Sequence, residues 1–258
     1  MFHSVYRALL IGLLFTPAVF PVASASEVSG PSSARVLKLN VSPNGYPPYT
    51  IVEKGNRFSG IVWDITTVIC DRLGYQLEAL KVPRKRVDGM LINGMIDATP
   101  RAKEWTEEPD NFVFTIPIVQ VSEVFFSRAE RAFEYFSPAD LESMTVLTHL
   151  GYKYPNIRDM FTSGKAKRFD VPKDQDIFKF LMHGDDFDVA VSDRLVGQWM
   201  IRKNGWQGQF HISKQPLTDV GLRLMLRPDM APFVSQYNEE LGKMKDSGEL
   251  ESILAAYR

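Results

Sequence analysis

Strand and helix patterns alternate along most of this chain, and that alternation constrains its fold more than any other feature. The segments VLKLNVS (36–42) and YQLEALKVP (75–83) are typical of strands, and each is followed by a helical pattern, at about 60–72 and 84–94. The same order returns later, where FDVAVSD (187–193) precedes the helical stretch RLVGQWMIRKN. Strands that alternate with helices predict an α/β protein with a parallel sheet.

Two long extended runs interrupt the alternation. They are FVFTIPIVQVSEVFFSRAE (112–130) and HISKQPLTDVGLRLMLRPD (211–229), and each is longer than an ordinary strand. Runs of this length suit crossings between two bodies. We therefore expect two lobes, the first formed by residues 36–121 plus 219–258 and the second by residues 122–218.

The cleft between these lobes is the expected functional site, because small-ligand sites favour domain interfaces and the carboxyl ends of parallel strands. Two local expectations accompany this organisation. A short strand at MIDAT (95–99) should be followed by a loop that contains Arg101, and one helix from about residue 230 to 257 should close the chain.

The N-terminal segment has the three parts of a secretory signal. Arg7 precedes an apolar run over residues 8–22, which ends in the small residues Ala23, Ser24 and Ala25. The run is about 15 residues long, whereas an apolar membrane-spanning helix needs about 20. The sequence therefore predicts a signal peptide over residues 1–25 that is cleaved near Ala25, a flexible leader over 26–35, and a periplasmic product.

Composition and cysteine content exclude several classes of function. The formal net charge is −1, so there is no basic surplus that would indicate a nucleic-acid partner or an anionic membrane surface. No later segment is long and apolar enough to predict direct membrane insertion. The four histidines are scattered, and no metal-ligand spacing, phosphate loop or Gly-x-Ser-x-Gly motif is present. We expect a monomer with no metal and no cofactor, in which the single cysteine, Cys70, is a buried small hydrophobic residue.

Several motifs, in their order along the chain, resemble the periplasmic solute-binding proteins of family 3, which serve polar amino acid ABC importers. They include YPPYT, FSGIVWDITTVICDRLGY, LINGMIDATPR, FLMHGDDFDVAVSD and DVGLRLMLRPD, and the resemblance covers residues 36–258. It implies the type II periplasmic-binding-protein fold, with two Rossmann-like lobes joined by two hinge strands. It also implies capture of an amino acid or related small polar solute and delivery to a membrane permease.

Two other functions stay open for a chain of this resemblance. One is an exported enzyme of the same fold, similar to cyclohexadienyl dehydratase. Such an enzyme needs a general acid or base, and His149 and Glu104 are the only candidates near the cleft. The other is a soluble partner that presents ligand to a receptor.

The resemblance also implies two charged ligand contacts. The family binds an α-ammonium group with a second-lobe aspartate, which matches Asp193 at the end of Asp188-Val-Ala-Val-Ser-Asp193. Asp193 also suits the N-cap of the following helix. The family's carboxylate-binding arginine has no clean match, and Arg101 is the nearest candidate, since a guanidinium binds a carboxylate bidentately. Alternatively, Arg101 is a surface residue that pairs with Glu104.

Five further residues are candidates for the cleft. By resemblance Tyr46 stacks on the ligand, while Tyr49 is either a cleft wall or a core residue. Arg84 follows a strand and is a candidate anion contact. The loop that contains Tyr152 and Lys153 lies between a strand and a helix, where free backbone N–H groups can bind a carboxylate. Lys153 would add a positive charge, which would suit an acidic ligand.

Overall fold

The computed structural model describes Met1 and residues 35–258. The predicted signal peptide and the leader up to residue 34 lie outside the described residues. Residues 35–258 belong to one compact unit. Among the helices that the structure describes, none combines the length and the apolar character needed to cross a membrane.

The first lobe is built on three strands in the order β4-β1-β5. These are β1 (Arg35–Val41), β4 (Tyr75–Lys81) and β5 (Ala98–Ala102), and β1 runs parallel to both neighbours. The helices α1 (Ile61–Leu73) and α2 (Arg84–Ile92) follow the loops that leave β1 and β4, and a small ladder joins β2 (Ile51–Val52) to β3 (Phe58–Ser59). The predicted alternation of strands and helices is confirmed here.

The second lobe repeats this plan with three parallel strands in the order β10-β8-β9. The strands are β8 (Thr145–His149), β9 (Lys167–Val171) and β10 (Val189–Asp193). The helices that accompany them are α3 (Arg158–Thr162), α4 (Asp174–His183) and α5 (Arg194–Asn204). Short 3-10 helices occupy the connections of both lobes, at Lys103–Trp105, Pro109–Asn111, Ala129–Arg131, Pro138–Leu141, Pro155–Ile157 and Pro228–Met230.

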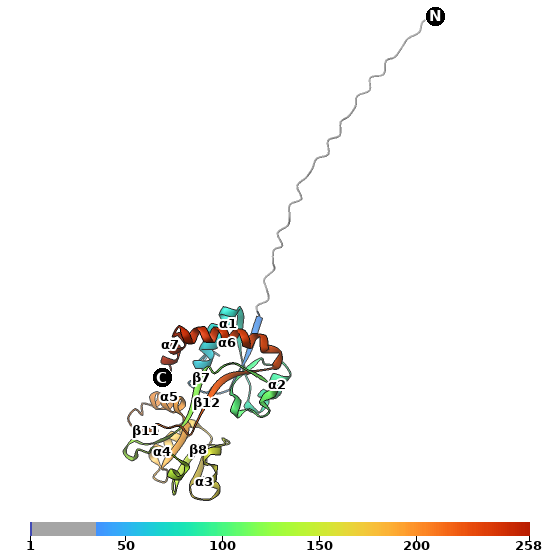
Figure 1. Cartoon of the computed structure of the whole chain (residues 1–258). Coiled ribbons are helices and arrows are strands. Elements are labelled where there is room, and N and C mark those ends of the chain that lie inside the picture. The colour runs from blue at the N-terminus through green and yellow to red at the C-terminus, as the bar shows by residue number, and fades with distance from the viewer. Residues whose placement is uncertain (2–34) are drawn as a thin grey trace. The chain divides into compact units, whose positions relative to one another are not determined.

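Two long antiparallel strands join the lobes, β7 (Val119–Arg128) and β12 (Thr218–Leu226), which run side by side between them in Figure 1. Residues Val119–Glu123 of β7 pair with Thr218–Leu222 of β12, and β7 continues into the second lobe as the neighbour of β10. The short strands β6 (Val113–Phe114) and β11 (Phe210–Ile212) pair with β12 and β7. Both long runs are therefore crossings, as predicted.

Two local predictions were wrong. The strand expected at MIDAT begins only at Ala98 and extends through Ala102, because β12 pairs with it antiparallel and places Arg101 opposite Arg223. Arg101 therefore lies in a strand instead of a loop. The single terminal helix is divided into α6 (Ala231–Asp246) and α7 (Glu249–Ala255) by Gly248, whose φ of 79° is in the left-handed region that glycine adopts without steric cost.

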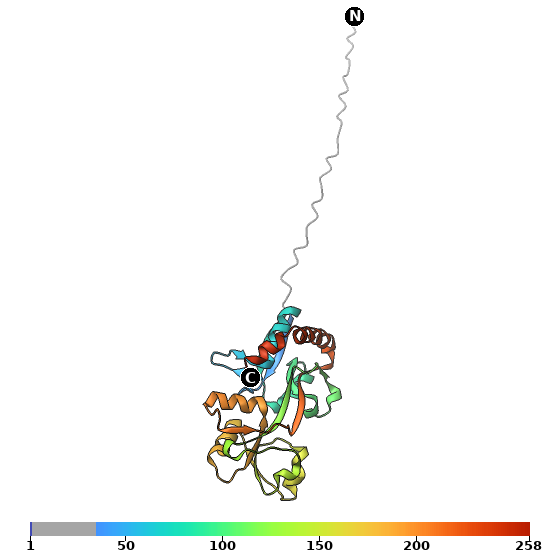
Figure 2. The ribbon, with the colours of Figure 1, turned by 60° about the vertical axis from the view of Figure 1, so that its left-hand side comes forward.

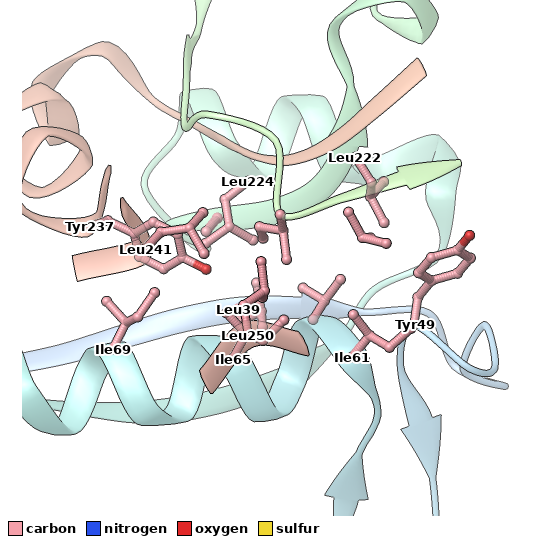
Figure 3. Packing of buried hydrophobic residues seen from close by; sticks show 14 of the residues in the cluster. Leu39, Tyr49, Ile61, Ile65, Ile69, Leu222, Leu224, Tyr237, Leu241 and Leu250 are labelled. Atoms are coloured by element: carbon pink, nitrogen blue, oxygen red, sulfur yellow. The ribbon is translucent and has the colours of Figure 1, made fainter. Parts of the chain in front are cut away.

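The core of the first lobe packs α1 and α6 against the sheet. The apolar residues Ile61, Ile65 and Ile69 recur every four positions along α1 and are fully buried (Figure 3). Tyr49 lies at one end of the cluster, with its hydroxyl pointing away from the aliphatic side chains (Figure 3). Cys70 is also fully buried, which confirms its prediction as a core residue, and burial raises the pKa of its thiol to about 12.

The C-terminal end of the chain contacts both lobes. It lies beside α5 in two views (Figures 1 and 2), where the side chain of Arg202 donates a hydrogen bond to the carbonyl of Tyr257. The Tyr257 hydroxyl in turn bonds to Asp64 of α1 and accepts a hydrogen bond of 2.9 Å from the Gly60 N–H. Tyr257 therefore contacts both the start of α1 and the body of α5.

A close contact between α5 and β7 positions the helix that begins directly after Asp193. A Cβ added at Gly197 would lie 2.1 Å from the Phe126 ring, whereas a Cβ added at Gly89 of α2 meets nothing within 4 Å. We expect Gly197→Ala to lower the free energy of unfolding by about 1–3 kcal/mol through overpacking. Gly89→Ala, the matched control, should raise it by about 0.5–1 kcal/mol. Urea unfolding of both variants measures this, and equal effects would contradict the packing account.

Candidate functional site

The carboxyl ends of parallel strands from both lobes supply the candidate site. In the second lobe, His149 is the last residue of β8, Asp193 is the last residue of β10, and Asp174 begins α4 after the end of β9. In the first lobe, the loop that leaves β1 carries Tyr46 and Tyr49. The edge position is the one expected for ligand sites in α/β sheets.

Asp193 forms a hydrogen bond between the lobes. Its Oδ1 accepts a hydrogen bond of 2.8 Å from the Tyr49 hydroxyl and another of 2.9 Å from the Val196 N–H. Asp193 is therefore the N-cap of α5, as one of its two predicted roles requires. Its other oxygen, Oδ2, is buried and accepts no hydrogen bond from the described residues. The ligand role of Asp193 stays a prediction, and Oδ2 is the atom available for it.

The pKa of Asp193 is raised, as expected for a buried carboxylate that no basic side chain of the described residues pairs with. Burial raises the pKa of the Asp193 carboxyl to about 6, against the opposing effect of the Val196 N–H and the Tyr49 hydroxyl and the smaller effect of the Ser122 and Leu195 N–H groups. Burial also raises the pKa of Tyr49 well above its ordinary value, and the adjacent Asp193 charge raises it further. A positively charged group at Oδ2 would favour the ionised carboxylate.

The raised pKa of Asp193 predicts a specific pH dependence of stability. The folded state holds this proton more tightly than the unfolded state, whose carboxyl has a pKa of 3.8, so stability falls as pH rises from about 4 to about 7. The penalty at pH 7.5 is up to about 3 kcal/mol. We expect the unfolding free energy of wild type minus that of Asp193→Asn to become more negative across this range. Urea unfolding at several pH values measures the difference, and a constant difference would contradict the assignment.

Tyr46 and Tyr49 form a stacked pair in the loop that leaves β1. Their ring centroids are 5.4 Å apart with an interplanar angle of 21°. Tyr49 is 1% exposed and packs in the core of the first lobe, while its hydroxyl reaches Asp193. Its contact with a ligand stays a prediction. Tyr46 is half-buried, and its position is compatible with the predicted stacking on a ligand.

Arg101 is buried and already has an anionic partner. Its Nη1 lies 2.8 Å from Oδ1 and 3.1 Å from Oδ2 of Asp88, one turn after Arg84 in α2. The alternative partner, Glu104, is not the one observed. Burial lowers the pKa of Arg101, the Asp88 charge raises it, and the neighbouring Arg84 charge lowers it. Arg84 and Arg101 therefore lie close together, and their contact with a ligand stays a prediction.

The second-lobe loop brings Tyr152 into the same region. Its ring packs on His149, with centroids 4.3 Å apart. Burial raises the pKa of Tyr152, the Asp174 charge raises it further, and the Arg84 charge lowers it. Tyr152 thus lies within electrostatic reach of a first-lobe arginine. Lys153, next to it, is exposed, so its contribution to an anion site stays a prediction.

Sequence reasoning missed three carboxylates near the predicted residues. Asp174 begins a helix that follows a parallel strand, which is the same placement that identified Asp193. Glu123 of β7 accepts a hydrogen bond of 2.8 Å from the Thr218 hydroxyl, and burial together with the Asp193 charge favours a raised pKa. Asp88 lies in α2, and its pairing with Arg101 was missed because Arg101 was expected in a loop.

A separate cavity of about 450 Å³ lies between β7 and α7. It is lined by aliphatic residues such as Ile118, Leu250 and Leu254, and charged residues lie around them. Asp193 is the only predicted site residue among its lining residues. The cavity therefore shares Asp193 with the candidate site, but none of the candidate tyrosines and arginines lines it. Within the described part of the chain, no three His, Cys, Asp or Glu side chains are grouped to hold a metal ion.

The sequence from residue 38 to 258 matches the model of the bacterial extracellular solute-binding proteins, family 3. The chain belongs to this family. No curated protein sequence matches it. The family 3 membership confirms the resemblance that the motifs predicted.

Solved structures resemble this family 3 chain over most of its length. One is assigned as a binding component of an ABC transporter from Wolinella succinogenes, in complex with lysine, and is 17% identical with a TM-score of 0.71 over 86% of this chain and 95% of that one. An ancestral amino acid-binding protein, described as a precursor of cyclohexadienyl dehydratase, is 18% identical with a TM-score of 0.66 over 86% and 95%. A histidine kinase sensor domain is 20% identical with a TM-score of 0.69 over 86% and 96%.

These similarities show the fold. The family 3 chain has the two-lobed type II periplasmic-binding-protein fold, as predicted, with β7 and β12 as the strands that join its lobes.

Proposed function

We propose that this family 3 protein binds an amino acid or a related small polar solute in the cleft between its lobes. The observation that carries the proposal is the burial and hydrogen bonding of the Asp193 carboxylate. Its carboxylate is buried at the carboxyl edge of the sheet and is bonded to the opposite lobe through Tyr49, and its Oδ2 accepts no hydrogen bond from the part of the chain that the structure describes. An ammonium group is the natural partner for such an oxygen, since buried charges are normally paired.

Arg101 and Arg84 are the proposed contacts for a carboxylate on the same solute. The Asp88 side chain that now pairs with Arg101 is 44% exposed, so it can turn into solvent at little cost when a ligand carboxylate takes its place. Tyr46 would lie against the solute from the first lobe, with Tyr152 and the backbone near Lys153 on the opposite side. Contacts from both lobes would favour a closed state of the protein.

We propose that the protein, once it has bound its solute, delivers that solute to an ABC importer. The family membership supports this role, as does the predicted signal peptide over residues 1–25. We propose that the exported form begins near Ser26, with lobes over 36–121 plus 219–258 and over 122–218, and that it docks as a monomer on a membrane permease. Intact-mass measurement of the periplasmic protein tests the first step, and a mass that retains residues 1–25 would contradict it.

A thermal-shift screen over amino acids, followed by calorimetric titration, tests the binding function. A ligand that binds only the folded state at 100 times its Kd adds about 2.7 kcal/mol of stability. We expect the best amino acid to raise the melting temperature and its N-acetyl derivative, which lacks the ammonium group, to have no effect. Equal shifts for the two compounds would contradict the proposed contact with Asp193.

The catalytic alternative has one supporting observation, which is that the His149 ring lies close enough to Asp174 for its charge to act on that carboxyl. Such a pair is able to move a proton. We propose binding without turnover, because the rest of the cleft is arranged around charge pairing. Incubation with the screened ligand and with prephenate, followed by NMR, distinguishes the two functions, and any product would favour the enzyme.

A further inference from the structure

The strand β9 forms a free edge of the sheet in the second lobe. It ends the strand order, and its only partner among the strands that the structure describes is β8. Four of its five residues, Lys167 to Asp170, are exposed, and Val171 is buried. An unpaired strand edge presents N–H and C=O groups to which another strand can bind. The edge of β9 can therefore accept a further strand.

The hydrogen bonds of β9 define which of its backbone groups face outward. Its first residue, Lys167, donates its N–H to a carbonyl just before β8, and the carbonyl of its last residue, Val171, accepts from an N–H just after β8. Backbone groups alternate in direction along a strand, so those of the odd-numbered residues face β8. The backbone groups of Arg168 and Asp170 therefore face the free edge, where an antiparallel partner would bind them.

The side chains of β9 are complementary to a second copy of the same strand. In an antiparallel pair centred on Phe169, Arg168 lies opposite the partner's Asp170, and Phe169 lies opposite the partner's Phe169. Opposite charges and aromatic rings that face each other across two strands stabilise such a pair. Two-fold symmetry repeats the charge pair. The residues with outward backbone groups, Arg168 and Asp170, then occupy the hydrogen-bonded positions of the ladder.

The charges select this register over its neighbours. Moving the two-fold axis by one residue along β9 places Arg168 opposite a second Arg168, or Asp170 opposite a second Asp170, and like charges directly opposite are destabilising. Within the chain, Arg168 donates to Asp170 Oδ1 through Nε and Nη2, at 2.9 and 2.7 Å. The two side chains therefore lie on the same face of the sheet and are only partly exposed. The paired arrangement requires this common face.

An aromatic cluster lies on the opposite face of β9. The ring centroid of Phe169 is 5.1 Å from that of Phe187 and 6.3 Å from that of Phe180 on α4. Phe169 is 45% exposed and Phe180 is 43% exposed. A second copy paired at Phe169 would cover part of this apolar surface, and removing apolar surface from water is favourable.

We propose that two copies of this protein associate through their β9 strands, in an antiparallel pair centred on Phe169. The contact uses one short strand and the rings beside it, so we expect a weak dimer that dissociates on dilution. The monomer proposed to dock on a permease is the dissociated form in this equilibrium. None of the candidate solute contacts lies on β9, so the association does not depend on the identity of the solute.

Sedimentation equilibrium of the exported protein tests the association, over a range from about 10 µM to about 1 mM that suits a small interface. Wild type should form a dimer at the upper end of this range. Phe169→Asp places two carboxylates opposite each other and should raise the dissociation constant at least about 10-fold. Phe136→Asp is the matched control, because Phe136 is 69% exposed in the same lobe but lies outside β9. It should dimerise as wild type does.

Three results would overturn the proposal. They are a wild-type protein that stays monomeric over the whole range, a dimer that Phe169→Asp leaves unchanged, and an equal loss of dimer in Phe169→Asp and Phe136→Asp. The last two would show that the copies meet through another surface or through general apolar contact. Melting curves show whether each variant is folded.

A charge exchange tests the register. Arg168→Asp and Asp170→Arg each place like charges opposite one another in a dimer of the variant, so each alone should be monomeric. An equal mixture restores both pairs of opposite charges, and its mixed dimer should have a dissociation constant within about 3-fold of wild type. The double variant that carries both changes keeps the pair within the chain and should also dimerise. Native mass spectrometry identifies the mixed dimer. Single variants that dimerise alone, or a mixture and a double variant that are folded and monomeric, would overturn the assignment.

Discussion

Asp193→Asn should weaken solute binding at least about 30-fold and yet leave the unliganded protein at pH 7.5 at least as stable as wild type. The affinity loss follows because the variant replaces the charge that would pair with the ligand ammonium, and truncating such a desolvated pair costs about 2–5 kcal/mol. The stability follows because burial raises the pKa of this carboxyl to about 6, so the ionised form is disfavoured in the folded state. Asparagine is also a good N-cap.

Calorimetric titration and urea unfolding of the same variant measure both effects. Asp188→Asn is the matched control, since Asp188 is exposed, lies at the opposite end of β10 and bonds to the Thr145 N–H. It should retain the wild-type affinity. An Asp193→Asn protein that binds normally would show that Asp193 is only a helix cap.

Arg101→Ala should weaken binding of a carboxylate-bearing solute at least about 30-fold, because a guanidinium in a desolvated site is the proposed partner of that carboxylate. Asp88→Asn should act in the opposite direction and strengthen binding of the same solute, since it removes the group that competes for Arg101. A solute that lacks a carboxylate should be almost insensitive to Arg101→Ala. Titrations of both variants with lysine and cadaverine measure these differences.

Near-wild-type affinity of Arg101→Ala for every carboxylate-bearing ligand would contradict this contact. Arg84 would then become the next candidate, because it is exposed at the start of α2 and its charge acts on both Arg101 and Tyr152. Arg84→Ala is therefore the companion variant.

The periodic parts of the fold were predictable from sequence because burial imposes them. The spacing of Ile61, Ile65 and Ile69 defines α1, and the left-handed Gly74 ends it. The strand β10 could be identified in the same way, and its position before a helix indicated that Asp193 lies at the edge of the sheet. Local pattern and tertiary position agree in these elements.

Pairing between distant strands was not predictable in the same way. Arg101 was expected in a loop because Pro100 precedes it, but β12 extends β5 past this proline, which lacks only the N–H that a ladder hydrogen bond would use. The Asp88 partner of Arg101 and the contact between Tyr49 and Asp193 likewise join residues whose proximity depends on how the strands and lobes are arranged. The sequence contains no local signal for such contacts.

A crystal structure with the tightest ligand from the screen tests the central claim most directly. The account predicts that the ligand lies between Tyr46 and the second-lobe sheet edge, with an ammonium nitrogen within about 3 Å of Asp193 Oδ2. A ligand bound in the cavity between β7 and α7, or bound in the cleft with Oδ2 still without a partner, would contradict it.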